Sequence, residues 1–125
     1  MDDLRFGGIA RLYGVEGLQR LEQAHVAVVG IGGVGSWAAE ALVRSGVGEI
    51  SLFDLDDICI TNINRQAHTL TDTVGQAKVE VMAQRLLAIN PACTVHAIAD
   101  FVSQDTMAEY ISQDLDFVVD CIDSV

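Results

Sequence analysis

Apolar residues along this chain gather in short continuous runs, separated by stretches in which they recur every three or four positions. The runs cover residues 25–29, 49–54, 94–99 and 117–121. A continuous apolar run of this length is typical of a strand that is covered on both faces, as in a parallel sheet. The sequence therefore predicts four buried parallel strands.

The stretches between the runs have the period of helices with one buried face. Residues 36–45 carry such a stripe, and Gly46 stands where a helix would end. Residues 74–89 carry a second stripe, limited by Pro91, and residues 103–112 carry a shorter one. Strands that alternate with helices predict an α/β fold, a doubly wound (Rossmann-like) parallel sheet with flanking helices.

Two segments follow from this pattern. Residues 1–24 are a polar lead-in that ends in a helix, and residues 25–125 form the Rossmann-like domain. In this architecture ligands bind at the carboxyl ends of the strands, and the chain stops just after the last predicted strand. We therefore expect the N-terminal portion of a larger domain, truncated at its C-terminal end.

Composition narrows the possible functions. Half of the 125 residues are hydrophobic and 20% are charged, which is typical of a folded chain rather than a disordered one. Seven Lys+Arg against 18 Asp+Glu give a net charge of −11. This balance argues against a protein whose main task is to bind nucleic acid phosphates, and no DNA partner is expected. An RNA substrate stays open if a basic surface lies elsewhere.

Cysteine usage and the first residues bear on location. Cys59, Cys93 and Cys121 are odd in number and have no Cys-x-x-Cys spacing, so neither a disulfide framework nor a zinc site is expected. The first residues are acidic and lack the apolar core of a signal peptide. We expect a cytoplasmic protein, with membrane association through a segment beyond Val125 left open.

A glycine-rich turn lies between the first predicted strand and the first predicted helix. It matches the pattern G-x-G-x-x-G, in which glycines permit a tight turn and a close approach of phosphate to the backbone. Asp54 follows about 20 residues later, where a carboxylate accepts hydrogen bonds from ribose hydroxyls. Together they predict a nucleotide site, with NAD as the simplest ligand. The cofactor-binding glycines are Gly30, Gly32, Gly33 and Gly35.

The segment after Asp54 favours a triphosphate over NAD. Arg65 and Lys78 are two of only seven cations, and Lys78 lies near the start of a predicted helix, whose dipole would act on the same anion. Asp56 and Asp123 offer oxygen ligands of the kind that magnesium takes. Each charge taken singly is more often a solvated surface group, so the prediction rests on the ordered set.

The ordered motifs resemble the ThiF-like adenylating superfamily, which includes ubiquitin-activating enzymes and sulfur-carrier adenylyltransferases. Its pattern is a glycine loop, D-x-D, N-x-N-R-Q, a lysine and a late aspartate, and it is matched over about residues 25–125. The resemblance implies ATP and Mg²⁺ as cofactors, with a monovalent cation as a further one. The implied ATP ligands are Asp54 on the ribose, Asp56 near the α-phosphate, Asn62, Arg65, Gln66 and Lys78 around the phosphates, and Asp123 on magnesium.

Three further strings resemble one branch of this superfamily, the tRNA threonylcarbamoyladenosine dehydratases. They are RFGGIARLYG at 5–14, GVGSWAAEAL at 33–42 and DCIDSV at 120–125. The resemblance implies ATP-dependent dehydration, by cyclisation, of threonylcarbamoyladenosine in tRNA through an acyl-adenylate. It also implies a homodimer, with Arg65, Lys78 and Asp123 as the catalytic residues. The 125-residue chain alone could lack activity.

Alternatives stay open at this stage. The first is an adenylyltransferase that activates the C-terminal glycine of a ubiquitin-like sulfur carrier, with that carrier or a sulfur-transfer protein as partner. An NAD-dependent dehydrogenase domain and a non-enzymatic dimerising module are two others. In the sulfur-carrier branch an N-terminal arginine reaches the partner subunit's ATP site, but Gly8 stands there in this chain, and Arg5 and Arg11 are the candidate substitutes.

The three histidines are predicted to have no catalytic or metal-binding role. His25, His68 and His96 have no companions at ligand spacing, so we expect residues of strand edges or loops. Trp37 is expected to contribute packing at the start of the first helix.

Overall fold

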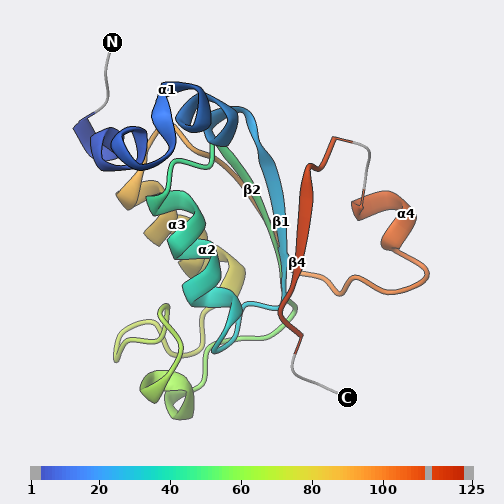
Figure 1. Cartoon of the computed structure of the whole chain (residues 1–125). Helices are drawn as coiled ribbons and strands as arrows, with labels where there is room; N and C mark the ends of the chain where they lie inside the picture. The colour runs from blue at the N-terminus through green and yellow to red at the C-terminus, as the bar shows by residue number, and fades with distance from the viewer. Residues whose placement is uncertain (1–3, 112–113, 123–125) are drawn as a thin grey trace.

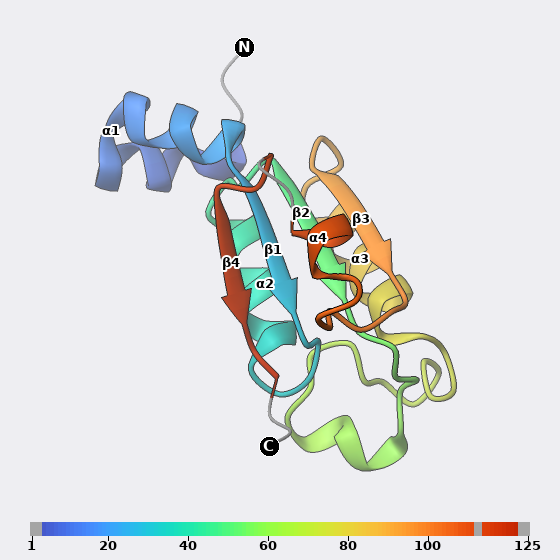
Figure 2. The same cartoon turned by 90° about the vertical axis from the view of Figure 1, so that its right-hand side faces the viewer.

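The computed structural model describes residues 4–111 and 114–122. Four parallel strands form one sheet in the order β3-β2-β1-β4 (Figure 2). The predicted α/β, Rossmann-like class is therefore confirmed. The strands are β1 (His25–Val29), β2 (Glu49–Phe53), β3 (Thr94–Ile98) and β4 (Phe117–Asp120).

Helices α2 (Gly35–Arg44) and α3 (Lys78–Ile89) cover one face of the sheet (Figure 1). The main core lies between them and the strands, where Val28 and Leu52 pack with Met82 of α3, all with no exposed surface. The strands and helices stabilise one another because each buries its apolar side chains against the neighbouring element.

A smaller core lies on the other face, beneath α4 (Met107–Tyr110). The Phe53 and Tyr110 rings pack with centroids 5.2 Å apart, and the Tyr110 hydroxyl donates a hydrogen bond of 2.7 Å to the Asp100 carboxylate. These contacts hold the segment between β3 and α4 over the carboxyl end of β2.

The crossovers change face between β1 and β4. The connections from β1 to β2 and from β2 to β3 run through α2 and α3, whereas the connection from β3 to β4 runs through α4 on the opposite face (Figures 1 and 2). In open α/β sheets such a reversal leaves a crevice at the carboxyl ends of the strands, and ligands bind there.

The N-terminal segment is helical over its described residues. A short 3₁₀ turn, η1 (Leu4–Phe6), leads into α1 (Gly7–Gln23), which lies near the amino ends of the strands (Figure 1). Gly14 bends α1 by adopting φ 81° and ψ 166°, a conformation that favours glycine. No helix in the described ranges has the length and apolarity required to cross a membrane.

Two predicted helix boundaries are wrong. Helix α3 begins at Lys78 rather than at residue 74, because Gly75 adopts φ 90° and Ala77 pairs with Asp57 in an isolated antiparallel bridge. Helix α4 is shorter than residues 103–112, of which residue 112 lies outside the described residues. The Thr106 hydroxyl accepts from the Ser103 N–H and donates to the Phe101 carbonyl, and such side-chain bonds compete with a helix.

Candidate nucleotide site

A cavity of about 590 Å³ opens at the carboxyl ends of β1, β2 and β4. This volume lies within the usual range for small-molecule sites. Residues from six separate stretches of the chain line the cavity, so the fold brings together side chains that the sequence keeps apart. Six of the predicted site residues are among them, namely Gly30, Gly32, Asp54, Asp56, Gln66 and Lys78.

The glycine loop is shaped by two close approaches of backbone. Gly30 adopts φ 92°, a left-handed conformation that strains other residues. Gly35 begins α2 directly against Gly30, and a Cβ at Gly35 would stand 1.7 Å from the Gly30 carbonyl oxygen. The sequence therefore needs glycine at both positions to turn from β1 into α2, which places the start of α2 beside the cavity.

Asp54 is held rigidly at the end of β2. One carboxylate oxygen accepts the Ile31 N–H at 2.7 Å, and the other accepts the Asp56 N–H at 2.8 Å. A carboxylate oxygen accepts more than one hydrogen bond, so both retain acceptor capacity toward the cavity. This geometry suits a ligand that presents two hydroxyl donors.

Lys78 and Gln66 are buried, and the Lys78 ammonium and the Gln66 side-chain oxygen have no partner among the described residues. Lys78 is 8% exposed, and no described carboxylate forms an ion pair with it. Gln66 is 7% exposed, and its side-chain oxygen has no hydrogen-bond partner among the described groups. A buried charge without a partner is costly, so this pair indicates that a polar, anionic ligand completes the site.

Asp56 contributes in two ways. Its carbonyl accepts the Lys78 N–H at 3.1 Å, which fixes the first residue of α3 beside β2. Its carboxylate is exposed at the cavity, and no described group is hydrogen-bonded to it. A lysine and an uncommitted carboxylate that line one cavity are the components of a site for an anion together with a cation.

Four predicted site residues lie outside the cavity lining. Asn62 is buried, and its side-chain oxygen accepts the Cys59 N–H at 2.9 Å, so it organises the 3₁₀ helix η2 (Ile60–Asn64). The Arg65 side chain runs beside the glycine loop, with its Cδ 3.6 Å from the position of a Cβ on Gly33. Gly33 lies in the turn between β1 and α2, and Gly35 begins α2, so both belong to the glycine loop without lining the cavity. Asp123 falls outside the described residues.

The Arg65 guanidinium is exposed. It donates to the Thr61 carbonyl at 3.1 Å and to the Asn64 side chain at 2.9 Å, both within its own loop. The Trp37 indole N–H donates to the Arg65 carbonyl at 2.7 Å, which ties this loop to the first turn of α2. Beyond the packing expected of it, Trp37 therefore positions the loop that carries Arg65.

His68 is a site residue that the sequence reasoning missed. It is 1% exposed, and its Nε2 hydrogen-bonds with the Ile31 carbonyl at 2.8 Å. Burial lowers the pKa of His68, so the imidazole is neutral, and its Nε2–H donates to that carbonyl. Since Asp54 accepts the Ile31 N–H, Asp54 and His68 together fix both polar groups of one residue in the glycine loop. No residue pattern signals this role, because the contact joins residues 37 apart in the chain.

The segment after β3 forms a wall of the cavity that was also missed. It comprises Asp100, Phe101, Val102 and Ser103. The hydrogen bond from Tyr110 lowers the pKa of Asp100 and raises the pKa of Tyr110 to about 12. No motif marks this segment, and only the crossover through α4 brings it over the cavity.

Comparison with known proteins places these features in a family. The ThiF family model matches residues 8–125. The tRNA threonylcarbamoyladenosine dehydratase of Escherichia coli K12 is 60% identical over 97% of this chain, and the chain covers 45% of that relative. The structure of E. coli tRNA N6-threonylcarbamoyladenosine dehydratase, TcdA, in complex with ATP superposes with a TM-score of 0.94 at 60% identity, over 97% of this chain and 50% of that one.

A more distant relative is the molybdopterin-synthase adenylyltransferase of Salmonella typhimurium, 38% identical over 94% of this chain and 47% of its own length. The chain thus spans about half the length of the curated relatives it matches. The superfamily resemblance drawn from the motifs is confirmed: the chain belongs to the ThiF family.

Proposed function

We propose that this chain is the ATP-binding part of an enzyme that dehydrates threonylcarbamoyladenosine in tRNA. The observation that carries the proposal is the buried Lys78, which faces a cavity beside Asp54 without an acidic partner among the described residues. The 60% identity to a dehydratase of that name, and the solved complex of that enzyme with ATP, support this assignment.

In this proposal each cavity residue meets one part of ATP. Asp54 accepts hydrogen bonds from the ribose hydroxyls, and the glycine loop of Gly30 and Gly32 lies against the phosphates. Lys78 and Gln66 contact phosphate oxygens, which gives their buried polar groups partners. Asn62 holds the loop in shape, and Arg65 reaches the phosphates by a rotation of its exposed side chain.

The chemistry activates a carboxylate, which is otherwise a poor electrophile because oxide is a poor leaving group. The threonyl carboxylate attacks the α-phosphate of ATP, and the bond to pyrophosphate breaks to give an acyl-adenylate. A nitrogen of the same nucleoside then attacks the activated carbonyl, AMP leaves, and the ring closes with the net loss of one water. Lys78 and Arg65 offset charge that shifts toward the leaving phosphates, and the fixed Asp54 orients the nucleotide.

The residues present fit a magnesium ion in part. Asp56 supplies an oxygen ligand at the cavity that no described group engages. Asp123, which lies outside the described residues, is proposed as the second. When bound, magnesium would neutralise phosphate charge. A monovalent cation is proposed only on the family resemblance.

The proposal extends to the domain organisation, the oligomeric state and the tRNA partner of the complete protein. We propose residues 1–24 as the lead-in and residues 25–125 as the first part of a larger domain. Exposed apolar residues on the edge strand β4, including Phe117 at 68%, support further structure beside it. We further propose that the complete protein is a cytoplasmic homodimer, which binds tRNA through a basic surface outside this acidic chain.

Arg5 is one of the candidates to reach the partner subunit's ATP site. Its side chain donates to the Ile89 carbonyl, away from the cavity of its own chain.

The alternative is adenylation of the C-terminal glycine of a sulfur-carrier protein. It uses the same nucleotide site, and the 38% identity to a molybdopterin-synthase adenylyltransferase supports it less strongly than the 60% identity supports the dehydratase.

The experiment that separates the two uses the complete protein that carries this chain, with ATP, magnesium and tRNA containing threonylcarbamoyladenosine. The tRNA is digested and the nucleosides are weighed by mass spectrometry. Loss of one water that depends on ATP and disappears in Lys78→Ala supports the dehydratase. Transfer of AMP to a carrier glycine without that loss would move the protein to the other branch.

A further inference from the structure

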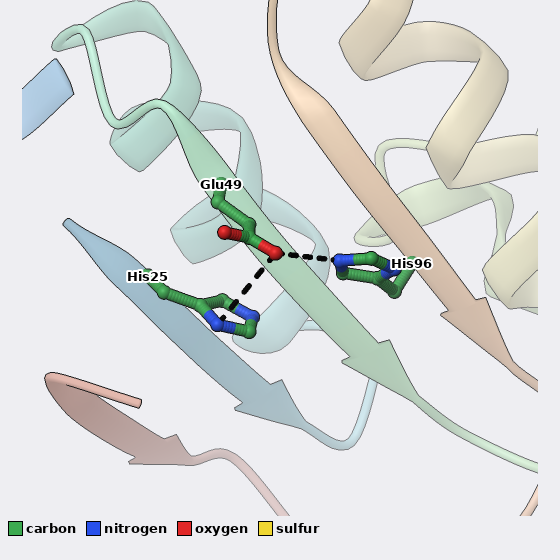
Figure 3. A group of neighbouring side chains, drawn as sticks. All are labelled: His25, Glu49 and His96. Carbon is green, nitrogen blue, oxygen red and sulfur yellow. Dashed lines mark hydrogen bonds and ion pairs between the residues drawn. The ribbon is translucent and has the colours of Figure 1, made fainter. Parts of the chain in front are cut away.

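A second group of chemically active side chains lies at the opposite edge of the sheet from the nucleotide cavity. His25 begins β1, Glu49 begins β2 as its register partner, and His96 lies two residues beyond Thr94, the partner of Glu49 on β3. Side chains at these positions share one face of the sheet. Figure 3 shows Glu49 between the two imidazoles. The expectation that these histidines lack companions is therefore wrong for His25 and His96.

The spacing of the three side chains matches a metal site. His96 Nε2 lies 2.7 Å from Glu49 Oε2, and His25 Nδ1 lies 3.8 Å from the same oxygen. All three ligand atoms lie within 4.8 Å of one another. Bonds of about 2.0–2.1 Å in a tetrahedron place ligand atoms roughly 3.3 Å apart. The separations of 2.7 and 3.8 Å bracket that value, and the half-exposed Glu49 and His96 side chains have room to adjust.

A buried hydroxyl orients His25. His25 Nε2 lies 2.7 Å from Ser51 Oγ, and Ser51 is 5% exposed. When Nε2–H donates to this oxygen, Nδ1 presents a lone pair toward the Glu49 carboxylate. Two acceptors then face each other across 3.8 Å, an arrangement that a cation between them stabilises. A metal-binding histidine usually has its other ring nitrogen fixed in this way.

We propose that His25, Glu49 and His96 bind a zinc ion, with Ser51 as the group that orients His25. Two imidazoles and one carboxylate favour a borderline transition metal such as zinc over magnesium, which prefers oxygen ligands. Three protein ligands leave one tetrahedral position for water. The net charge of −11 raises the local concentration of cations.

The zinc ion would join the amino ends of three adjacent strands. It does not depend on the nucleotide chemistry, because a five-residue strand of roughly 15 Å separates the two edges of the sheet. Its role would be to stabilise this end of the sheet, by cross-linking three strands that are otherwise joined here by their backbone ladders.

The test is a titration of the metal-free complete protein with Zn²⁺ near neutral pH, followed by calorimetry and by competition with a chromogenic zinc indicator. Visible absorption of bound Co²⁺ reports tetrahedral coordination directly. The variants are His96→Ala, Glu49→Gln and Ser51→Ala. Glu16→Gln, which removes an exposed charge on α1, is the matched control for Glu49→Gln.

Loss of an orienting partner typically weakens metal affinity about 10–100-fold. We therefore expect about a 10-fold loss in Ser51→Ala, more than about 100-fold in His96→Ala and Glu49→Gln, and no change in Glu16→Gln. The absorption band of Co²⁺ should disappear with His96. ATP binding should stay unchanged in every variant.

Either of two results would overturn the proposal. One is equal Zn²⁺ affinity in the wild type and His96→Ala. The other is the absence of stoichiometric Zn²⁺ binding to the wild type. If His96→Ala fails to fold, His96→Gln keeps the side-chain size and serves the same comparison.

Discussion

Replacing Gly35 with alanine tests the close packing of the glycine loop. The added Cβ would stand 1.7 Å from the Gly30 carbonyl oxygen and 2.8 Å from its carbon, whereas real Cβ contacts are essentially never below 3.0 Å. The start of α2 and the loop must therefore separate by more than about 1 Å. Overpacking costs about 1–3 kcal/mol, and more when backbone rather than a side chain must yield. We expect Gly35→Ala to lose at least about 3 kcal/mol of unfolding free energy.

Gly32→Ala is the matched control. Its added Cβ would stand 3.6 Å from Gln66 Nε2, an ordinary contact, so the stability should change by no more than about 0.5 kcal/mol. Gly32 lines the cavity, so this variant should instead weaken ATP binding. Urea denaturation followed by circular dichroism measures both free energies. An unchanged midpoint in Gly35→Ala would refute the reasoning about the loop.

Two other predictions follow from pKa shifts. Burial holds the pKa of His68 below the ordinary histidine value of about 6.5, so the unfolded chain binds the proton more readily. The unfolding free energy should therefore fall as pH drops below about 6.5, by at most ~1.4 kcal/mol per pH unit. His68→Gln should reduce that slope in urea titrations, and an identical slope would contradict it. The Thr61 hydroxyl lowers the pKa of Cys59, whereas burial raises those of Cys93 and Cys121. Iodoacetamide should therefore alkylate Cys59 before Cys93 and Cys121, and the alkylation of Cys59 should be slower in Thr61→Val than in the wild type. Peptide mass spectrometry measures both rates, and earlier reaction of Cys93 would argue against this prediction.

The fold could be predicted because its signals are local. The apolar runs mark the strands, and Gly46 and Pro91 mark where helices end. The start of α3 could not be predicted, since the apolar period continues through residues 74–77 while the bridge between Asp57 and Ala77 holds that stretch extended.

The sequence motifs predicted part of the candidate site, namely the residues that belong to the motifs themselves. Asp54, Gln66 and Lys78 do meet in one cavity, because Asp54 directly follows β2, Gln66 follows η2 and Lys78 begins α3. The anchoring role of His68 depends on a hydrogen bond across 37 residues, and no residue pattern encodes it. The cluster of His25 and His96 likewise depends on strand register, which pairs positions distant in sequence.

The most direct test of the nucleotide site compares the affinities of wild type and Lys78→Met for ATP and for adenosine. Methionine keeps the buried aliphatic stem and removes the charge. A charge-assisted hydrogen bond contributes about 1.5–3 kcal/mol, so ATP affinity should fall about 10- to 100-fold, while adenosine affinity stays within about 2-fold. Equal losses for both ligands, or no loss for either, would contradict the placement of the phosphates against Lys78.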